Sequence, residues 1–390
     1  MVEAYIVDAV RTAGGRRNGR LMGWHPADMA AEMFNALLDR TRIDPAAVDD
    51  VILGCVTQGG EQSASLGRTA VLGSRLPRSV PAVTIDRQCG SSQQAMHFAA
   101  QAVMSGTQDV VIAAGAESMS RVPMFSNVAL YANAGVGTGP WSKRVLDRFE
   151  VDGFSQFRGA QMIADSYGFS RNELDEFALE SHRRAAEAAR SGAFTQEIIP
   201  LRIETPHGSQ VHNQDEGIRF DASLTSIGAV KALEEGGKIT AANASQICDG
   251  ASAVLIVNER ALGVHGLAPM ARIHNITVTA GDPVIMLEEP IPATRKALQR
   301  AGMRIEDIDL YEVNEAFAPV PLAWLRAIGA DPARLNVNGG AIALGHPLGS
   351  SGTKLMATLL HALRARGGRY GLQTMCEGGG MANVTIVERL

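Results

Sequence analysis

The chain lacks any long hydrophobic run. Its longest uninterrupted apolar stretches, such as residues 110–114 and 253–257, are far shorter than the ~18 residues that a membrane-spanning helix needs. The first eight residues, Met-Val-Glu-Ala-Tyr-Ile-Val-Asp, carry acidic residues around their only apolar run, unlike the basic start and apolar core of a secretory signal. We therefore expect neither an integral membrane protein nor an exported one.

Cysteine is scarce, and positive charge is not in excess. The four cysteines, Cys55, Cys89, Cys248 and Cys376, have no CxxC spacing, which argues against both a disulfide framework and a zinc ribbon. With 36 Lys and Arg against 41 Asp and Glu, the net charge of -5 gives no general attraction to nucleic acid or anionic lipid. We expect reduced thiols in the cytoplasm, and neither nucleic acid nor membrane as a partner.

Apolar residues and glycine are abundant. Of the 390 residues, 46% are hydrophobic and 41 are glycine, a composition that can bury a large core. The glycines cluster at the ends of short apolar runs, as in proteins that turn repeatedly from strand to helix. At this length the chain should form at least two packed units.

Strands and helices alternate in the first and last thirds of the chain. In the first part, predicted strands at 4–9, 50–56, 82–86 and 109–114 alternate with helices at 26–40, 61–73 and 91–105. In the last third, strands at 271–279, 309–313, 335–338 and 370–375 alternate with helices at 292–301, through Trp324, and at 351–365. The pattern predicts an α/β fold with a mostly parallel sheet covered by helices.

The two parts indicate an internal duplication. Val-Ile-Leu-Gly-Cys-Val at 51–56 aligns with Leu-Tyr-Glu-Val-Asn-Glu at 310–315, and Val-Val-Ile-Ala-Ala-Gly at 110–115 aligns with Tyr-Gly-Leu-Gln-Thr-Met at 370–375. The two pairs have nearly the same offset along the chain, and the elements follow in the same order. Chance similarity between short β-rich strings is the alternative.

The segment between the two parts, residues 119–242, has a different texture. Residues 131–140 are loop-like, and residues 171–191 form a predicted amphipathic helix with Ser170 as its cap. We interpret this segment as an inserted lid or loop domain. Near the start of the chain, arginines at 11, 16, 17 and 20 lie beside glycines; they can hold phosphate, but a solvated surface turn is the interpretation we favour.

Cys89 is the first candidate catalytic residue. It stands between the predicted strand 82–86 and a helix opened by Gly90, Ser91 and Ser92. Free amides and the macrodipole at a helix N-terminus favour a thiolate and lower the pKa of the thiol, so Cys89 is a candidate nucleophile. A small core residue is the alternative for a cysteine at such a turn.

His346 is a candidate base for that nucleophile. It lies in the glycine-rich string Asn-Gly-Gly-Ala-Ile-Ala-Leu-Gly-His-Pro-Leu-Gly-Ser-Ser-Gly at 338–352. The offset between the two halves carries Cys89 into this same turn of the other half. If the halves pack with pseudo-twofold symmetry, His346 and Cys89 can face each other, and a Cys–His pair supplies a base beside the nucleophile.

Two further predicted strands end in reactive or polar residues. The string Thr-Met-Cys-Glu-Gly-Gly-Gly at 374–380 places Cys376 beside glycines, whose uncovered amides suit an oxyanion hole, so Cys376 is a candidate acid/base thiol. The string Asn-Glu-Ala-Phe-Ala at 314–318 follows the strand 309–313. Asn314 there can hold a water or a carbonyl oxygen, or it can simply cap a helix.

Together these strings resemble the thiolase family. They are Gln-Cys-Gly-Ser-Ser-Gln-Gln-Ala at 88–95, Asn-Glu-Ala-Phe-Ala at 314–318, Gly-Gly-Ala-Ile-Ala-Leu-Gly-His-Pro-Leu-Gly at 339–349 and Cys-Glu-Gly-Gly-Gly at 376–380. The resemblance runs nearly end to end and implies two similar α/β halves stacked as five layers, α-β-α-β-α, with an inserted loop domain. The N-terminal half would be residues 1–118 and 243–263, the loop domain 119–242, and the C-terminal half 264–390.

The resemblance also implies catalytic roles. Cys89 would take the acyl group as a thioester, His346 would activate its sulfur, and Cys376 would move the proton on the carbon of the acetyl-CoA unit. Asn314, through a water, and His346 would form one oxyanion hole. Backbone amides at Cys89 and Gly378 would form the other.

Binding partners are implied in the same way. Ser245 matches a position that family members place against the pantetheine of CoA. Arg219 and Ser226 match positions that they place at the nucleotide end of CoA. CoA would be a co-substrate, no cofactor or metal would be permanently bound, and the enzyme would be a homodimer or homotetramer.

The acyl pocket departs from that of biosynthetic short-chain thiolases. Those enzymes usually carry His-Met-Gly where this chain has Ser-Gln-Phe-Arg-Gly at 155–159, and the strings here look more like degradative thiolases of actinobacterial lipid and steroid catabolism. We therefore expect thiolytic cleavage of a 3-ketoacyl-CoA to acetyl-CoA and a shortened acyl-CoA. The alternative is that the space left by the absent residues is filled by Phe154, Phe157 or Met286, which would restore a short acyl pocket. The alternatives are an acetyl-CoA acetyltransferase, a ketoacyl synthase, or a non-catalytic thiolase-like lipid carrier.

Overall fold

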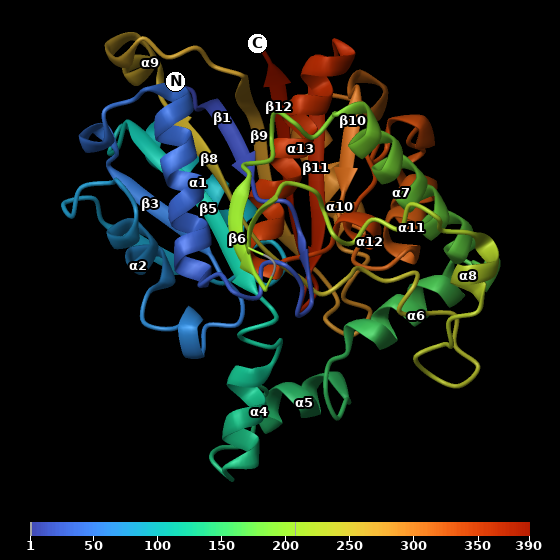
Figure 1. The fold of residues 1–390 in the computed structure, drawn as a ribbon. Coiled ribbons are helices and arrows are strands. Elements are labelled where there is room, and N and C mark those ends of the chain that lie inside the picture. Colours follow the sequence, from blue (N-terminus) through green and yellow to red (C-terminus); the bar gives the residue numbers. More distant parts are fainter. Residues whose placement is uncertain (1, 207) are drawn as a thin grey trace.

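The computed structural model describes residues 2–206 and 208–390 (Figure 1). The first half of the main sheet has the strand order β4-β3-β5-β8-β1, with the short β2 beside β8. Strands β3, β4 and β5 run parallel, whereas β8 is antiparallel to both β5 and β1. The strands are β1 (Tyr5–Arg11), β2 (Gly15–Arg16), β3 (Asp50–Gly54), β4 (Ala82–Ile85), β5 (Val110–Ser118) and β8 (Cys248–Val257). The helices are α1 (Pro26–Thr41), η1 (Pro45–Ala47), η2 (Gly60–Gln62), α2 (Leu66–Gly73), α3 (Ser91–Ser105) and α9 (Glu259–His265).

The second half of the sheet has the order β10-β11-β12-β9 and joins the first through a short β9–β1 pairing. Strands β10 and β11 are parallel, and β12 is antiparallel to both β11 and β9. The strands are β9 (Ala271–Ala280), β10 (Leu310–Val313), β11 (Tyr370–Glu377) and β12 (Met381–Arg389). The helices are α10 (Pro290–Ala301), η3 (Ile305–Asp307), α11 (Pro319–Ile328), η4 (Pro332–Arg334), α12 (Ala341–Leu344), η5 (Leu348–Ser350) and α13 (Ser351–Arg366).

Three buried clusters define five layers. One cluster packs α1 and α2 against the first half-sheet, with Phe34 and Leu53 among its members. The second places α3 and α13 between the two half-sheets, and the third packs α10 and α11 against the outer face of the second half-sheet. The predicted α-β-α-β-α arrangement is therefore confirmed. In the described part of the chain, no helix is long and apolar enough to cross a membrane.

The internal duplication is visible in the element boundaries. Strands β3 and β5 and helix α3 begin at Asp50, Val110 and Ser91, and β10, β11 and α13 begin at Leu310, Tyr370 and Ser351, each at the same offset. The two central helices are thus counterparts in the two halves. Each follows a turn that carries a candidate catalytic residue, so the duplication sets where the site is built.

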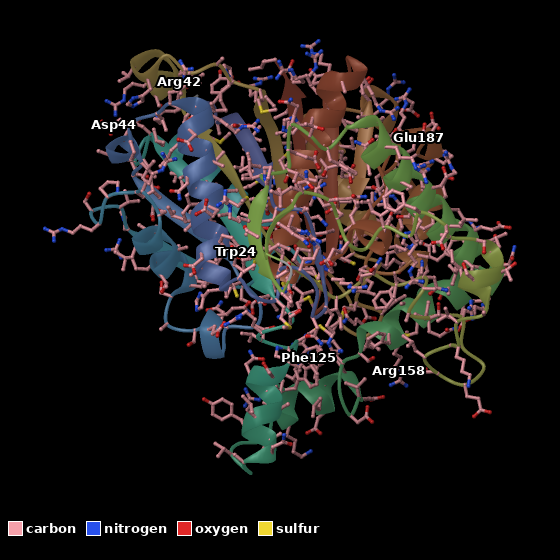
Figure 2. The ribbon with its side chains drawn as sticks, in the orientation of Figure 1. Trp24, Arg42, Asp44, Phe125, Arg158 and Glu187 are labelled. Carbon is pink, nitrogen blue, oxygen red and sulfur yellow. The ribbon has the colours of Figure 1, made fainter. Side chains whose placement is uncertain are left out.

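The chain between β5 and β8 extends from the two halves. Helices α4 and α5 project from the body as an arm (Figure 1), and Phe125 lies where this arm meets the rest of the molecule (Figure 2). Helix α7, begun by a capping box of Ser170 and Glu173, packs against α12. The elements are α4 (Ser126–Asn133), α5 (Lys143–Phe149), α6 (Gln156–Ser166), α7 (Arg171–Ser191), β6 (Leu201–Thr205), β7 (Gly208–His212) and α8 (Leu224–Gly228). The division at residues 119 and 242 remains a prediction.

Three sequence interpretations need correction. The sheet is mixed rather than mostly parallel, because β8, β1, β9 and β12 reverse direction. The strand predicted at 335–338 is absent. Instead, Asn336 takes a left-handed backbone, with φ 42°, and its side-chain amide makes both hydrogen bonds to the backbone of Val313, each 2.9 Å. The third is Arg11, which is fully buried and pairs with Glu197 at 2.6 Å and Asp215 at 2.8 Å rather than lying in a solvated turn.

Candidate active site

Cys89 lies in a closely bonded turn between β4 and α3. The Ser91 hydroxyl accepts the amide of Arg87 at 2.9 Å and donates to the carbonyl of Gln88 at 2.6 Å. Gln88 itself takes a left-handed backbone, with φ 49°. The turn therefore fixes Cys89 immediately before the first residues of α3, where it is partly exposed.

The position at a helix N-terminus does not make Cys89 a thiolate in the resting protein. Although Cys89 keeps some exposure, the protein atoms packed around it remove much of the water from its sulfur, and this desolvation raises the pKa of Cys89 to about 12; the nearby Glu377 carboxyl adds to the increase. The low pKa expected from the helix start is therefore wrong, because the loss of hydration outweighs the dipole. The thiol needs a base to take its proton.

His346 has the protonation state that such a base needs. Its Nδ1 lies 2.5 Å from the Ser351 hydroxyl, which donates to the carbonyl of Pro347 at 3.0 Å, so the hydroxyl oxygen accepts the Nδ1 proton of the imidazole. This leaves a lone pair on Nε2, which has no hydrogen-bond partner among the described residues. Burial lowers the pKa of His346 to about 3, with the Lys354 charge acting in the same direction, so the ring is neutral at physiological pH.

Helices α3 and α13, which follow the turns of Cys89 and His346, meet at their N-termini. The amide of Thr353 donates to the Ser92 hydroxyl at 3.0 Å. A methyl group on Gly352 would lie 2.1 Å from the amide nitrogen of Gln93, so only glycine allows this approach. The pseudo-symmetric packing expected from the duplication thus brings the two helix starts into direct contact.

Cys376 comes from the end of β11. Its side chain is fully buried, and burial together with the neighbouring Cys89 raises its pKa well above the usual range. The turn that follows contains Gly378, at which an added methyl group would lie 2.9 Å from the side-chain oxygen of Gln88. The β11–β12 turn is therefore pressed against the turn that carries Cys89, and Cys376 is a neutral thiol beside the nucleophile.

Asn314 follows β10 and is 1% exposed. Its backbone amide donates to the carbonyl of Thr374 at 3.0 Å, which ties it to β11, while neither atom of its side-chain amide has a partner in the described structure. Asn314 and Ser351 line one cavity of about 10 Å³. That volume can hold a single water. His346 is not among the residues that line this cavity, so the role of Asn314 in an oxyanion hole remains a prediction.

Comparisons with known proteins agree with this geometry. Family models described as "Thiolase, N-terminal domain" and "Thiolase, C-terminal domain" match residues 4–260 and 267–389. The chain belongs to the thiolase family. A steroid 3-ketoacyl-CoA thiolase of Mycobacterium tuberculosis is 55% identical, with 100% of this chain and 95% of that protein covered.

Two further relatives extend the match. An acetyl-CoA acetyltransferase of Escherichia coli is 40% identical over the full length of both chains. The crystal structure of human mitochondrial 3-ketoacyl-CoA thiolase has a TM-score of 0.89 at 36% identity, covering 100% of this chain and 99% of that one. The predicted thiolase fold and the predicted class, a CoA-dependent acyltransferase, are confirmed.

The predicted CoA contacts of this thiolase lie on three segments. Ser245 is half-buried and its amide donates to the carbonyl of Ala316 at 2.9 Å, close to Asn314 in the chain. Arg219 is exposed, and its amide donates to His182 on α7 at 3.1 Å. Ser226 is exposed in the first turn of α8, where its hydroxyl donates to the carbonyl of Ser223 at 2.9 Å. Their contact with CoA remains a prediction.

Sequence reasoning missed two groups that hold the His346 turn. Lys354 is buried in α13 and donates to the carbonyls of Leu344 and Gly345, each at 2.8 Å. Glu117 at the end of β5 is buried and accepts the amide of Gly349 at 2.9 Å. A lysine within an otherwise apolar stretch of α13 was the available signal for the first. For the second, the signal was that the duplication aligns Glu117 with Glu377, the residue after Cys376.

Exposure gives a testable order of reactivity for the four thiols of this thiolase. We expect iodoacetamide to label Cys89 first, because Cys55, Cys248 and Cys376 are buried. An acyl-CoA present during the reaction should protect Cys89. Peptide mapping after brief treatment measures this, and faster labelling of Cys55 or Cys248 would contradict the assignment.

Proposed function

We propose that this thiolase uses CoA to cleave a 3-ketoacyl-CoA into acetyl-CoA and a shortened acyl-CoA, by a ping-pong mechanism through an acyl-cysteine. The observation that supports it is that the starts of α3 and α13, which follow Cys89 and His346, are in contact, while His346 is neutral and its Nε2 has no hydrogen-bond partner among the described residues. Cys89 also lies close enough to Cys376 to raise the pKa of the Cys376 thiol. The path is reversible, so the same residues would also perform the Claisen condensation.

In the first half-reaction, the sulfur of Cys89 attacks the 3-keto carbonyl while Nε2 of His346 takes its proton. Backbone amides at Cys89 and Gly378 stabilise the oxyanion that forms. The Cα–Cβ bond then breaks, and Cys376 gives its proton to the carbon of the departing acetyl-CoA enolate. Protonated His346, with Asn314 acting through a water, stabilises the enolate oxygen.

In the second half-reaction, the thiolate left on Cys376 takes the proton of free CoA, whose sulfur attacks the thioester on Cys89. The released Cys89 thiolate recovers its proton from His346, and all three groups return to their starting states. Ser245, Arg219 and Ser226 would hold the CoA. This chemistry needs no metal or redox cofactor.

We also propose a cytoplasmic homo-oligomer, a dimer or a tetramer. The free thiols suit a reducing compartment. The projecting arm exposes large apolar side chains that a second copy would cover, including Phe125 at 55% and Leu130 at 67% exposure. Both proposals remain to be tested on the purified protein.

The substrate we propose is bulkier than acetoacetyl-CoA, a medium-chain or steroid-derived 3-ketoacyl-CoA. The M. tuberculosis relative carries a steroid substrate in its name, and the chain lacks His-Met-Gly at 155–159. Phe157 is 39% exposed and packs edge-to-face against Phe317, with ring centres 5.5 Å apart. Met286, by contrast, is buried.

Comparing kcat/KM for acetoacetyl-CoA, a C8 or C10 3-ketoacyl-CoA and a steroid-fragment CoA ester tests this proposal. Each buried methylene adds about 0.8 kcal/mol of binding, so we expect the larger esters to be preferred by tenfold or more. A tenfold preference for acetoacetyl-CoA would instead make this chain an acetyl-CoA acetyltransferase, like its E. coli relative by name. No acetyl-CoA from any of the three would contradict thiolytic cleavage of these esters and favour the lipid-carrier alternative.

A further inference from the structure

Glu377 is a buried carboxyl that the mechanism above does not use. It ends β11 directly after Cys376, and because neighbouring side chains on a strand point to opposite faces, the two side chains diverge. Glu377 has 0% exposure, and within residues 2–206 and 208–390 neither carboxyl oxygen makes a hydrogen bond of normal geometry; the nearest donor is the backbone amide of Asn383, which lowers the pKa of Glu377. A methyl group on Gly90 would lie 1.9 Å from its Oε1. The carboxyl is therefore packed directly against the turn that carries Cys89.

The duplicated half supplies an internal comparison. Glu117, near the end of β5, is the counterpart of Glu377. Its carboxyl accepts four hydrogen bonds from nitrogen donors, the amides of Val56, Thr57 and Gly349 and the side chain of Gln62, at 2.9 to 3.0 Å, and a fifth from the Cys55 thiol at 3.8 Å. Gly349 is in turn the counterpart of Cys89, at the same offset along the chain. Each half therefore places a carboxyl against the turn before a central helix, but only the Glu117 carboxyl is held by several hydrogen-bond donors of normal geometry.

The charged and titratable groups around Glu377 do not neutralise it. Arg87, in the turn between β4 and α3, acts on Glu377, and Glu377 in turn acts on Cys89 and Cys376. Asp86 of the same turn and Glu117 of β5 act on the Cys89 sulfur, and Arg87 acts on His97 of α3. Arg87 is the only cation in this set. Among the described residues its Nε has no hydrogen-bond partner, and its Nη1 donates to the Met381 sulfur at 3.9 Å. His97 is neutral, because burial lowers its pKa to about 3. The facing β12 residues, 381–383, carry no charge.

Burial raises the pKa of Glu377 to about 8, against the opposing effect of Arg87. The side chain is therefore neutral below that pH and ionised above it. An ionised Glu377 carboxylate beside the Cys89 sulfur disfavours a second negative charge there, and a neighbouring like charge shifts a pKa by about one unit or more. Ionisation of Glu377 therefore raises the pKa of the Cys89 thiol, so that the thiolate is harder to form as pH rises.

We propose that Glu377 is a positioning residue that sets the alkaline limit of acyl transfer to Cys89: protonated, it packs as a neutral group behind the nucleophile turn, and ionised, it opposes the thiolate. The proton that Glu377 loses goes to hydroxide, and no bond to substrate is formed. This inference rests on the proposed role of Cys89 as the nucleophile.

The test is the pH profile of Cys89 alkylation by iodoacetamide, followed by peptide mapping from pH 6 to pH 10. For the wild-type chain we expect the logarithm of the rate to rise with pH, to flatten around pH 8 and then to rise again. Glu377→Gln should remove the flattening. At pH 9.5 it should react about tenfold faster than wild type, and at pH 6.5 within about twofold of it.

Two variants serve as controls. Glu377→Asp keeps the charge and should keep the flattening. Asp86→Asn removes a carboxylate from the same turn, but that side chain is turned toward the Gln88 amide at 2.7 Å, so it should change the rate at pH 9.5 by less than about twofold. Circular dichroism and the melting temperature check that each variant folds.

The outcomes separate this inference from the proposed function. If Cys89 is not the thiol that reacts, the proposed nucleophile is wrong. If Cys89 reacts but the Glu377→Gln and wild-type profiles coincide, only the role of Glu377 is overturned. A wild-type profile that rises smoothly through pH 8 overturns the role of Glu377 even if the variant fails to fold.

Discussion

Replacing Cys376 with alanine is expected to lower the turnover of a 3-ketoacyl-CoA by about 100-fold or more, while Cys89 still accepts an acyl group. The loss is that of a positioned acid–base group, which contributes about 10²- to 10⁴-fold. Attack of Cys89 on a thioester needs the nucleophile and His346 but no proton transfer to carbon. The two half-reactions should therefore separate in this variant.

Mass spectrometry of the intact Cys376→Ala protein, after mixing with an acyl-CoA, measures the acyl adduct directly, and steady-state formation of acetyl-CoA measures turnover. Cys55→Ala is the matched control, because it also truncates a buried thiol but one that lies at the end of β3 beside Glu117. It should lower the melting temperature with little change in kcat. Absence of an adduct on Cys89 in Cys376→Ala would refute the division of labour between the thiols.

The sequence predicted those parts of the fold that depend on neighbours in the chain. The helix expected at 91–105 coincides with α3, since Gly90 and Gly106 mark its two ends in the sequence itself. The equal offsets between the halves predicted that α3 and α13 would occupy equivalent places. Cys89, His346, Cys376 and Asn314 could be selected because each stands at the end of a predicted strand or in a glycine-rich turn.

The remainder depends on contacts between distant segments. Antiparallel pairing of β12 with β9 was not predictable, because the residue pattern within a strand does not indicate which other strand it pairs with. At Asn336 the side-chain amide, rather than the backbone of a strand, makes both hydrogen bonds to the backbone of Val313, and strand propensity alone does not indicate this. The pKa of Cys89 was predicted in the wrong direction because burial and the carboxyl of Glu377, which comes from the opposite half of the chain, outweigh the local helix start.

Replacing His346 with alanine is expected to have the larger effect, a fall in kcat of about 10³- to 10⁴-fold. This variant loses two functions of His346. Removal of the proton from Cys89 contributes about 10²- to 10⁴-fold by itself, and stabilisation of the enolate oxygen contributes about 10²- to 10³-fold. These factors do not multiply fully, because they belong to one cooperating unit. Acylation of Cys89 should be slowed along with turnover, unlike in Cys376→Ala.

Ser351→Ala is the graded companion to this variant. It leaves the imidazole in place but removes the hydroxyl that accepts the Nδ1 proton at 2.5 Å, so the tautomer with its lone pair on Nε2 is less favoured. We expect a fall in kcat of about tenfold, in the same step that His346→Ala impairs. Rapid acylation of Cys89 in His346→Ala, measured by quenched mass spectrometry, would show that another group takes the thiol proton.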